Sequence, residues 1–197
     1  MRNTVRRGRP PVADPVDVNL QAVALLAERG YNACTMEDIA RGIQVSTRTL
    51  HRYFSTKSDI VWAPINSSFG DLAGRLERSS PDAPVLIAIS EAVTGSFDEA
   101  PPGGRESMHL RLKLIAETPE LHSNSSEQFR QWRDVIVTFA SHRLGVGPTE
   151  LLPMLIGSTV QAATMAALNW WATHENPGSP QTVVAEALRT LGQGFAA

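Results

Sequence analysis

The chain has 197 residues, 42% of them apolar, which is enough for one large or two small globular domains with a sizeable core. Its single cysteine excludes an internal disulfide and fits the reducing cytoplasm, where we expect the protein to work. The charge is uneven: residues 1–57 carry a net of +4 and residues 58–197 a net of −6, which together give the overall −2. A basic segment on an acidic body is typical of a protein that meets a polyanion, although such a segment also arises by chance.

Residues 1–13 are polar and show no periodicity, which predicts a disordered basic arm. The arm also lacks the apolar stretch of a signal peptide. Arg7 and Arg9 flank a glycine, and two such arginines can lie along a narrow minor groove of DNA, where the negative potential is enhanced. The alternative is a tail that contacts only solvent.

A first helix is predicted over residues 15–29. Asp14 can cap its start, Pro15 occupies the first helical position, and Gly30 ends it. Its apolar positions recur at helical spacing, at Leu20, Val23, Ala24 and Ala27.

Two short helices follow within 25 residues. Thr35 with Asp38 three positions later predicts the capped start of a helix over about residues 36–42. A third helix starts at position 46 or 47 and ends at position 53 or 54. Three helices of which the last two are joined by three or four residues form a helix-turn-helix layout.

The segment ALLAERGYNACTMEDIARGIQVSTRTLHRYFSTKSDI resembles the amino-terminal domain of the TetR/AcrR family of bacterial transcriptional regulators. The matching residues are Arg29-Gly30-Tyr31, Thr35, Ile39-Ala40, Val45-Ser46, Thr49-Leu50, Tyr53-Phe54 and Lys57. Two positions depart from the family pattern: Gln44 stands where a glycine usually makes the turn, and His51 where an aromatic residue is usual. A positive φ at Gln44 would cost on the order of 1 kcal/mol.

The outward face of the third helix is the predicted DNA-binding surface. Arg48 can donate two hydrogen bonds to a guanine, and Thr47 can contact a thymine methyl group or a phosphate. The resemblance implies that Tyr53 and Lys57 contact phosphates, and Thr35 can offer its hydroxyl and backbone N–H at a helix start. The alternative is that the arginines are solvated surface charges. The full predicted set is Arg7, Arg9, Thr35, Ser46, Thr47, Arg48, Thr49, His51, Arg52, Tyr53 and Lys57.

The remaining residues predict further helices and no strand. A long fourth helix follows Ser58 as its cap, with Pro64 inside it to kink it or reset its start. Further helices are expected over about residues 85–97, 105–117 and 129–144, then from Gly147-Pro148 to about 173, and after Ser179-Pro180. We therefore expect an all-α chain of about nine helices: a helix-turn-helix domain over residues 14–57 and a ligand-binding and dimerisation bundle over residues 58–197.

The resemblance implies a pocket inside this bundle. Its candidate lining is Phe97, Met108, Leu112, Trp132, Phe139, Gln161, Met165 and Asn169, although the large apolar members also fit a plain core. Gln161 and Asn169 are polar groups in a largely apolar helix, so they need partners there. The layout of LRLKLIAETPEL, the Trp132 helix and AALNWW resembles family members tied to acyl-CoA-type effectors, which suggests a long apolar ligand.

The small residues of the helix before Thr173 permit close helix packing and resemble the family's homodimer interface, although packing within one chain would also explain them. The same stretch is interrupted by polar residues, so we expect no membrane span. No metal-ligand spacing, phosphate-binding loop or nucleophile motif is present, so we expect no enzyme, no metal and no cofactor. The sequence favours a homodimeric repressor that binds a palindromic operator in double-stranded DNA and is released by a small-molecule effector. The alternative is a helical ligand-carrying or interaction module that no longer binds DNA.

Overall fold

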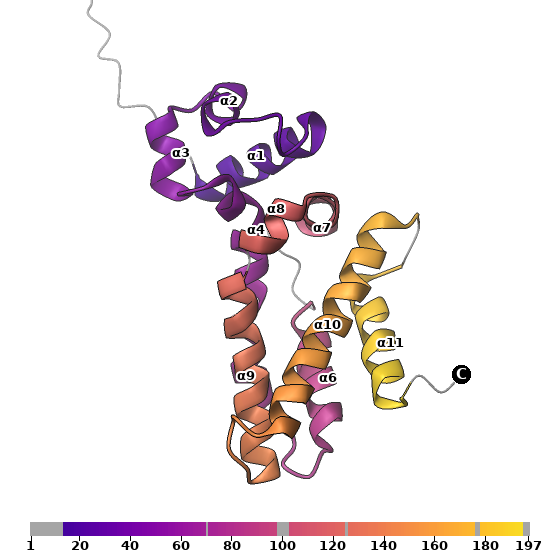
Figure 1. Cartoon of the computed structure of the whole chain (residues 1–197). Coiled ribbons are helices and arrows are strands. Elements are labelled where there is room, and N and C mark those ends of the chain that lie inside the picture. The colour runs from indigo at the N-terminus through magenta and orange to yellow at the C-terminus, as the bar shows by residue number, and fades with distance from the viewer. Residues whose placement is uncertain (1–13, 70, 98–102, 125, 176–177, 195–197) are drawn as a thin grey trace, which may run out of the picture.

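The computed structural model describes residues 14–69, 71–97, 103–124, 126–175 and 178–194. Within these ranges every regular element is an α-helix, which confirms the all-α fold class (Figure 1). The described helices are α1 (Pro15–Arg29), α2 (Met36–Gly42), α3 (Thr47–Tyr53), α4 (Lys57–Phe69), α5 (Leu72–Glu77), α6 (Val85–Gly95), α7 (Gly104–Glu117), α8 (Pro119–Asn124), α9 (Ser126–Leu144), α10 (Leu151–Thr173) and α11 (Pro180–Gly192).

Helices α1–α3 form a head, and α4–α11 form a body below it (Figure 1). The predicted caps of the head are confirmed: Asp14 accepts from the Val16 amide at 2.8 Å, and Gly30 ends α1 with a φ of +91°. The head is held together by fully buried apolar side chains from all three helices, Ala22, Leu26, Ile39, Ala40 and Leu50. Their burial fixes α3 against the other two helices.

The turn between α2 and α3 contains Gln44 in a left-handed conformation, with a φ of +57°. The amide of Val45 donates to the carbonyl of Ala40 at 3.0 Å and closes the turn. Gln44 therefore occupies a position that a glycine adopts without strain, and its side chain is exposed.

Replacing Gln44 with glycine is expected to raise the free energy of unfolding by up to about 1 kcal/mol. Relief of left-handed strain of roughly 1–2 kcal/mol outweighs the added entropy of the unfolded chain, about 0.4–1 kcal/mol. Urea unfolding measures the change. Gln193→Gly is the control, because Gln193 has a φ of −88° and no strain to relieve. Equal or lower stability of the Gln44 variant would contradict the strain.

Three predicted boundaries were wrong. The fourth helix begins at Lys57, and its cap is Thr56, whose hydroxyl accepts from the Asp59 amide at 3.1 Å while Asp59 accepts from the Thr56 amide at 2.9 Å. Ser58 therefore lies inside the helix and is buried. The helix runs through position 64 without restarting, and the expected single helix is divided into α4 and α5. Helix α10 begins at Leu151, after a turn over residues 147–150.

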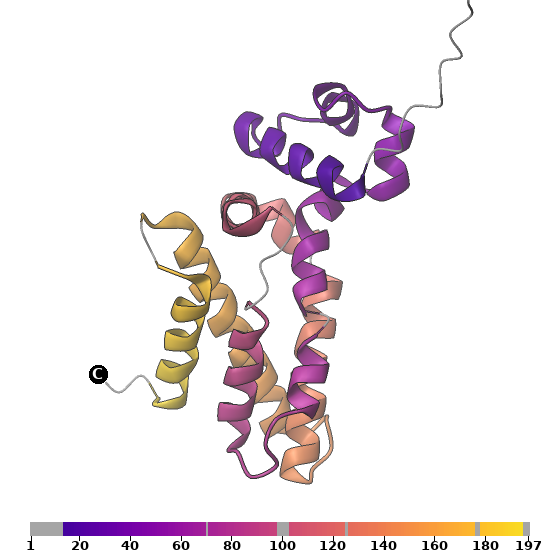
Figure 2. The same cartoon turned by 180° about the vertical axis from the view of Figure 1, so that it is seen from behind.

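The body is built around α10, which packs against α7, α9 and α11, while α7 also contacts α1 and α4 (Figures 1 and 2). Helix α10 approaches α9 closely at Gly157, where an added Cβ would lie 2.5 Å from Cγ2 of Val137. By length and composition α10 could cross a membrane, and it is the one described helix that could. Its inward face instead contributes Val160, Leu168 and Trp171 to a hydrophobic core that is continuous from head to body.

Candidate nucleic-acid interface

The orientation of α3 follows from its cap and from one buried residue. Ser46 accepts from the Thr49 amide at 3.0 Å, and the two hydroxyls lie 2.7 Å apart. Leu50 is fully buried against α1 and α2, so the opposite face of this seven-residue helix points to solvent. Arg48, His51 and Arg52 are exposed on it. Of the other residues predicted here to bind DNA, Ser46 is also exposed, whereas Thr47, Thr49 and Tyr53 are half-buried.

These α3 side chains differ in how much of their hydrogen-bonding capacity is used. Arg48 and His51 make no hydrogen bond or ion pair with any residue that the structure describes. Arg52 instead lies over the ring of Tyr53, 4.6 Å from its centroid, and donates to its hydroxyl at 2.5 Å. Arg48 and His51 are therefore available to a ligand outside the protein, whereas Arg52 and Tyr53 hold each other in place.

Lys57, a predicted phosphate contact, faces the protein. Its Nζ donates to the carbonyls of Tyr31 at 2.8 Å and Cys34 at 2.7 Å, and lies 4.4 Å from the centroid of the Tyr31 ring. Lys57 thereby ties the loop between α1 and α2 to the start of α4. Two of its three ammonium protons are used, which leaves one for a phosphate. Burial raises the pKa of Tyr31, with smaller contributions from Glu120 and Asp59.

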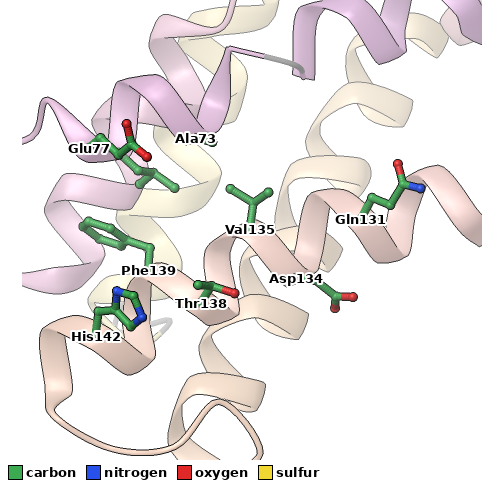
Figure 3. A pocket seen from close by; sticks show the side chains of 9 residues that line it. Ala73, Glu77, Gln131, Asp134, Val135, Thr138, Phe139 and His142 are labelled. Carbon is green, nitrogen blue, oxygen red and sulfur yellow. The ribbon is translucent and has the colours of Figure 1, made fainter.

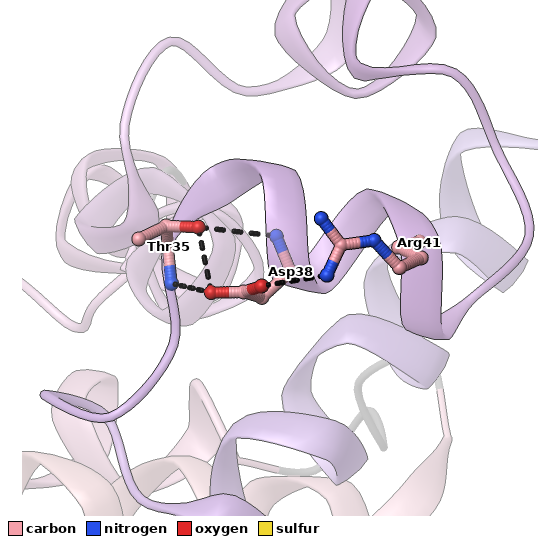
Figure 4. Close-up of polar contacts among 3 residues, drawn as sticks. All are labelled: Thr35, Asp38 and Arg41. Atoms are coloured by element: carbon pink, nitrogen blue, oxygen red, sulfur yellow. Dashed lines mark hydrogen bonds and ion pairs between the residues drawn. The ribbon is translucent and has the colours of Figure 1, made fainter.

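Thr35 is also occupied, by the capping box of α2 (Figure 4). Its hydroxyl donates to Oδ2 of Asp38 at 2.8 Å and accepts from the Asp38 amide at 3.1 Å, and its own amide donates to the same carboxylate at 3.1 Å. Arg41 completes the group with an ion pair to Oδ1 of Asp38 at 3.1 Å. A phosphate contact at Thr35 would compete with these bonds. The role of Thr35 in DNA binding stays a prediction.

The hydrogen bonds from Thr35, aided by the charge of Arg41, hold the pKa of Asp38 below its ordinary value of 3.8. A depressed folded-state pKa stabilises the fold above that ordinary value, and the contribution is lost as the pH falls through the folded pKa. Asp38→Asn is therefore expected to lower the Tm near neutral pH, with a difference from wild type that shrinks below pH 3.8. Thermal unfolding across this range tests it, with the exposed Asp17→Asn as control. A difference independent of pH would contradict the capping role.

A pocket of about 480 Å³ lies between α5 and α9 in the body (Figure 3). Leu76, Val135 and Phe139 supply apolar lining, and Glu77 and Asp134 supply carboxylates. The other lining residues are Ala73, Gln131, Thr138 and His142. The pocket is open to solvent, so it has the form of a groove with an apolar floor and an acidic rim.

Of the eight residues predicted to bind ligand, Phe139 lines this pocket. Four others are buried in the core, namely Phe97, Met108, Leu112 and Trp132. Gln161 has a partner within the protein, since its side-chain amide donates to the Phe129 carbonyl at 2.6 Å. Met165 and Asn169 are half-buried on α10. No metal-binding group of three or more side chains occurs in the described part of the chain.

Three buried polar atoms have no hydrogen-bond partner among the described residues: Nε1 of Trp62, Oγ1 of Thr164 and Oδ1 of Asn169. Thr164 is 1% exposed, yet its hydroxyl does not bond the preceding turn. Thr159 on the same helix does so, with a bond to the Leu155 carbonyl at 2.8 Å. Trp62 and Thr164 were not predicted from the sequence, although a threonine within the apolar stripe of α10 is a detectable signal. Arg7 and Arg9 lie outside the described residues.

Comparison with known proteins agrees with this geometry. Residues 21–63 match the family model described as bacterial regulatory proteins, tetR family, and residues 83–196 match the model described as the MftR C-terminal domain. The chain belongs to the TetR family of transcriptional regulators. This TetR-family protein is 27% identical over 197 residues to the Mycobacterium tuberculosis protein named "Putative mycofactocin biosynthesis transcriptional regulator MftR". The match covers 99% of this chain and 98% of that protein.

Solved structures share the fold of this regulator at low sequence identity. The fatty acid degradation regulator FadR of Bacillus halodurans superposes with a TM-score of 0.62 and 16% identity, over 96% of this chain and 98% of that one. FadR of Thermus thermophilus, solved in complex with lauroyl-CoA, superposes with a TM-score of 0.58 and 17% identity, over 92% and 95%. At these identities the likeness concerns the fold alone.

Proposed function

We propose that this TetR-family regulator is a cytoplasmic, homodimeric repressor that binds a palindromic operator through α3 and is released by a small apolar ligand of acyl type. The observation that carries the proposal is the exposed surface of α3. Leu50 holds this helix by its burial, and Arg48 and His51 are exposed and have no partner among the described residues. The unpaired guanidinium of Arg48 can donate to the acceptors of a guanine in the major groove, and Thr47 beside it can contact a thymine methyl group.

Side chains that already have partners within the protein are proposed to contact phosphates and not bases. Lys57 and the Arg52–Tyr53 pair are already held by the protein. Preorganised groups lose less conformational entropy on binding, so they suit contacts to the phosphate backbone that set the register of α3. Arg7 and Arg9 would add contacts to phosphates or to the minor groove next to the site of α3.

A dimer is supported by the outer face of α10. Its first turns expose Leu151, Leu152 and Leu155 at 80%, 51% and 51% of their surface, and Trp170 near its end is 47% exposed. Only 33% of the most apolar 18-residue stretch of this helix is buried within one copy. A second copy related by a two-fold axis would cover this face and would place two α3 helices for two half-sites of a palindrome.

The proposed ligand site lies inside the body, among the buried side chains that were predicted from the sequence to bind ligand. Unpaired buried polar atoms are costly, so Trp62, Thr164 and Asn169 are expected to find partners on a bound ligand. An acyl chain would lie among the apolar side chains, and its carbonyl could accept from the indole or the hydroxyl. The lauroyl-CoA complex of Thermus thermophilus FadR shows that the same fold holds such a molecule.

Release of DNA follows if the ligand favours a body conformation in which the two heads no longer match adjacent major grooves. Such a ligand shifts the population from the DNA-binding conformation to the released conformation. To invert a 99:1 ratio of these two conformations, the ligand must bind the released one more tightly by about 5.5 kcal/mol, and a smaller preference shifts the ratio in part.

Thr164→Val is expected to act in opposite directions on stability and on ligand binding. Without ligand the variant should be as stable as wild type or up to about 1 kcal/mol more stable, because an unpaired buried hydroxyl is replaced by a methyl group of similar size. Its affinity for lauroyl-CoA should fall roughly 2- to 10-fold, the value of one hydrogen bond. Thermal unfolding and calorimetric titration measure the two effects.

Thr159→Val is the matched control, because the Thr159 hydroxyl already has a partner in the Leu155 carbonyl. Its affinity for lauroyl-CoA should equal that of wild type. An unchanged affinity in the Thr164 variant would remove that hydroxyl from the ligand site.

Selection of bound sequences from a random duplex library tests the DNA-binding proposal. The expected product is a palindrome with half-site centres about one helical turn or a multiple apart, bound by an even number of protomers in light scattering. Recovery of no preferred sequence, or a protein that stays monomeric with and without DNA, would contradict it.

A further inference from the structure

A buried arginine joins the head to the body. Arg111 of α7 is 1% exposed, and its Nη1 donates to the carbonyls of Ile60 at 2.8 Å and Val61 at 3.2 Å in α4. Its Nη2 donates to Oδ1 of Asn19 in α1, and its Nε donates to the Ser107 hydroxyl at 3.2 Å. One side chain of the body therefore bonds α1 of the head and α4, the helix that leaves the head.

Asn19 closes this group from the head side. Its side-chain amide donates to the Ile60 carbonyl at 2.9 Å, the same oxygen that accepts from Arg111. Asn19 is 5% exposed, so the group is shielded from water. We call Asn19, Arg111 and the two carbonyls of Ile60 and Val61 the junction. It connects residues that are 41 to 92 positions apart in the chain.

Among the described residues, the acceptors of Arg111 are all neutral oxygens from carbonyls, an amide and a hydroxyl. Burial lowers the pKa of Arg111 to about 10, so the group is still charged at neutral pH. A buried charge without a carboxylate partner depends on every one of its hydrogen bonds. Such a group tolerates little displacement of one helix against the others, which is unusual for a residue that serves packing alone.

A second contact supports a tight fit at the same place. Gly103, just before α7, has a φ of +81°, and an added Cβ there would lie 2.3 Å from Cδ2 of Leu20 in α1. The start of α7 is thus pressed against the helix that carries Asn19. Figure 1 views α7 end-on, directly beneath the head and between it and the lower helices of the body.

We propose that Arg111 is a positioning residue that sets the angle of the head to the body, and with it the distance between the two α3 helices of a dimer. The effect on operator binding rests on the proposed function. The role of Arg111 in fixing the angle of the head rests on the hydrogen bonds of the junction. Because Arg111 lies on α7, a ligand that shifts α7 moves the guanidinium donors that hold the acceptors on α1 and α4, and the head turns with them.

The test measures the position of the head without DNA. Spin labels are placed on cysteines at Glu28 in α1 and Ile87 in α6, both exposed, while Cys34 is 3% exposed and shielded from the label. Pulsed electron paramagnetic resonance then reports the distribution of distances between head and body. With labelled chains diluted in unlabelled protein, so that one protomer of a dimer carries both labels, wild type should give one narrow distribution. Arg111→Met, which keeps an unbranched apolar stem and removes the donors, should broaden the distribution about twofold or shift its centre.

Arg143→Met is the matched control. Arg143 also donates to backbone carbonyls, those of Ser80 and Pro81, but its partners among the described residues lie within the body. Its variant should keep the wild-type distribution even if its Tm falls. Arg111→Lys keeps the charge and should restore part of the narrow distribution. Asn19→Leu removes the acceptor and the donor that the head contributes and should broaden the distribution, whereas an unchanged distribution would contradict the inference; this variant decides the matter if Arg111→Met does not fold.

The consequence for DNA is measured on operator fragments with half-sites moved by one base pair in either direction. Wild type should prefer one spacing, and Arg111→Met should reduce that preference about tenfold, whereas loss of general stability would weaken all spacings alike. Unchanged distances and spacing preference in Arg111→Met, with only a lower Tm, would overturn the inference. If wild type binds no DNA, the proposed function fails while the distance measurement still decides the role of Arg111.

Discussion

Leu50→Ala is expected to lower the free energy of unfolding by about 2–5 kcal/mol and to abolish operator binding at temperatures where the variant head is unfolded. Leu50 is fully buried and is the residue of α3 whose burial holds that helix against α1 and α2. Its truncation leaves a cavity in a small three-helix core that has few other side chains able to fill it. Chemical unfolding followed by circular dichroism measures the change.

Ile87→Ala is the control for this change, because it removes a side chain of equal size from a position that is 50% exposed. Its stability should lie within about 0.5 kcal/mol of wild type, which is usual for surface substitutions. A Leu50 variant as stable as the Ile87 variant would mean that α3 is not held by this core.

Arg48→Ala is expected to weaken operator binding by about 1–3 kcal/mol for each half-site, or about 5- to 150-fold, and to relax the base preference at one position. Arg48 is exposed and has no partner in the described part of the chain, so its loss leaves no buried group unpaired and should not change the Tm. Fluorescence anisotropy with the operator and with single-base variants of it measures both effects.

Arg78→Ala removes the same charge from an exposed position on the body and serves as the control. It should bind the operator nearly as wild type does, since a charge far from the interface is screened over about 10 Å at ordinary salt. If Arg48→Ala and Arg78→Ala weaken binding equally, the effect of Arg48 would be one of net charge and not of base recognition.

The head could be predicted closely because its determinants are local. Each of its helix boundaries depends on side chains within four positions of one another. The boundaries are found at the expected residues, namely Asp14, Gly30, Thr35 with Asp38, and Ser46. The left-handed turn at Gln44 lies where the family pattern has a glycine, although the sequence alone left the sign of its φ open. Two boundaries in the body that were predicted from proline were wrong, since α4 runs through position 64 without restarting and α10 begins at Leu151 and not at Pro148.

Contacts between distant segments could not be predicted in this way. The same sequence motif permits Lys57 to point to DNA or to the carbonyls of Tyr31 and Cys34, and tertiary packing decides between them. The junction of Asn19 with Arg111 spans 92 positions. Its one local signal is a polar residue on an apolar stripe, since Asn19 shares helical spacing with Ala22, Val23 and Leu26, and Arg111 with Met108 and Ile115.

The central claim, ligand-controlled DNA binding through α3, is tested most directly by titrating the protein against the DNA upstream of its own gene at several salt concentrations, with and without lauroyl-CoA. We expect tight binding whose logarithm falls steeply and linearly with the logarithm of the salt concentration, as for several phosphate contacts. We also expect lauroyl-CoA to release the wild-type complex. Binding indifferent to salt, to lauroyl-CoA and to the Arg48→Ala change would contradict it.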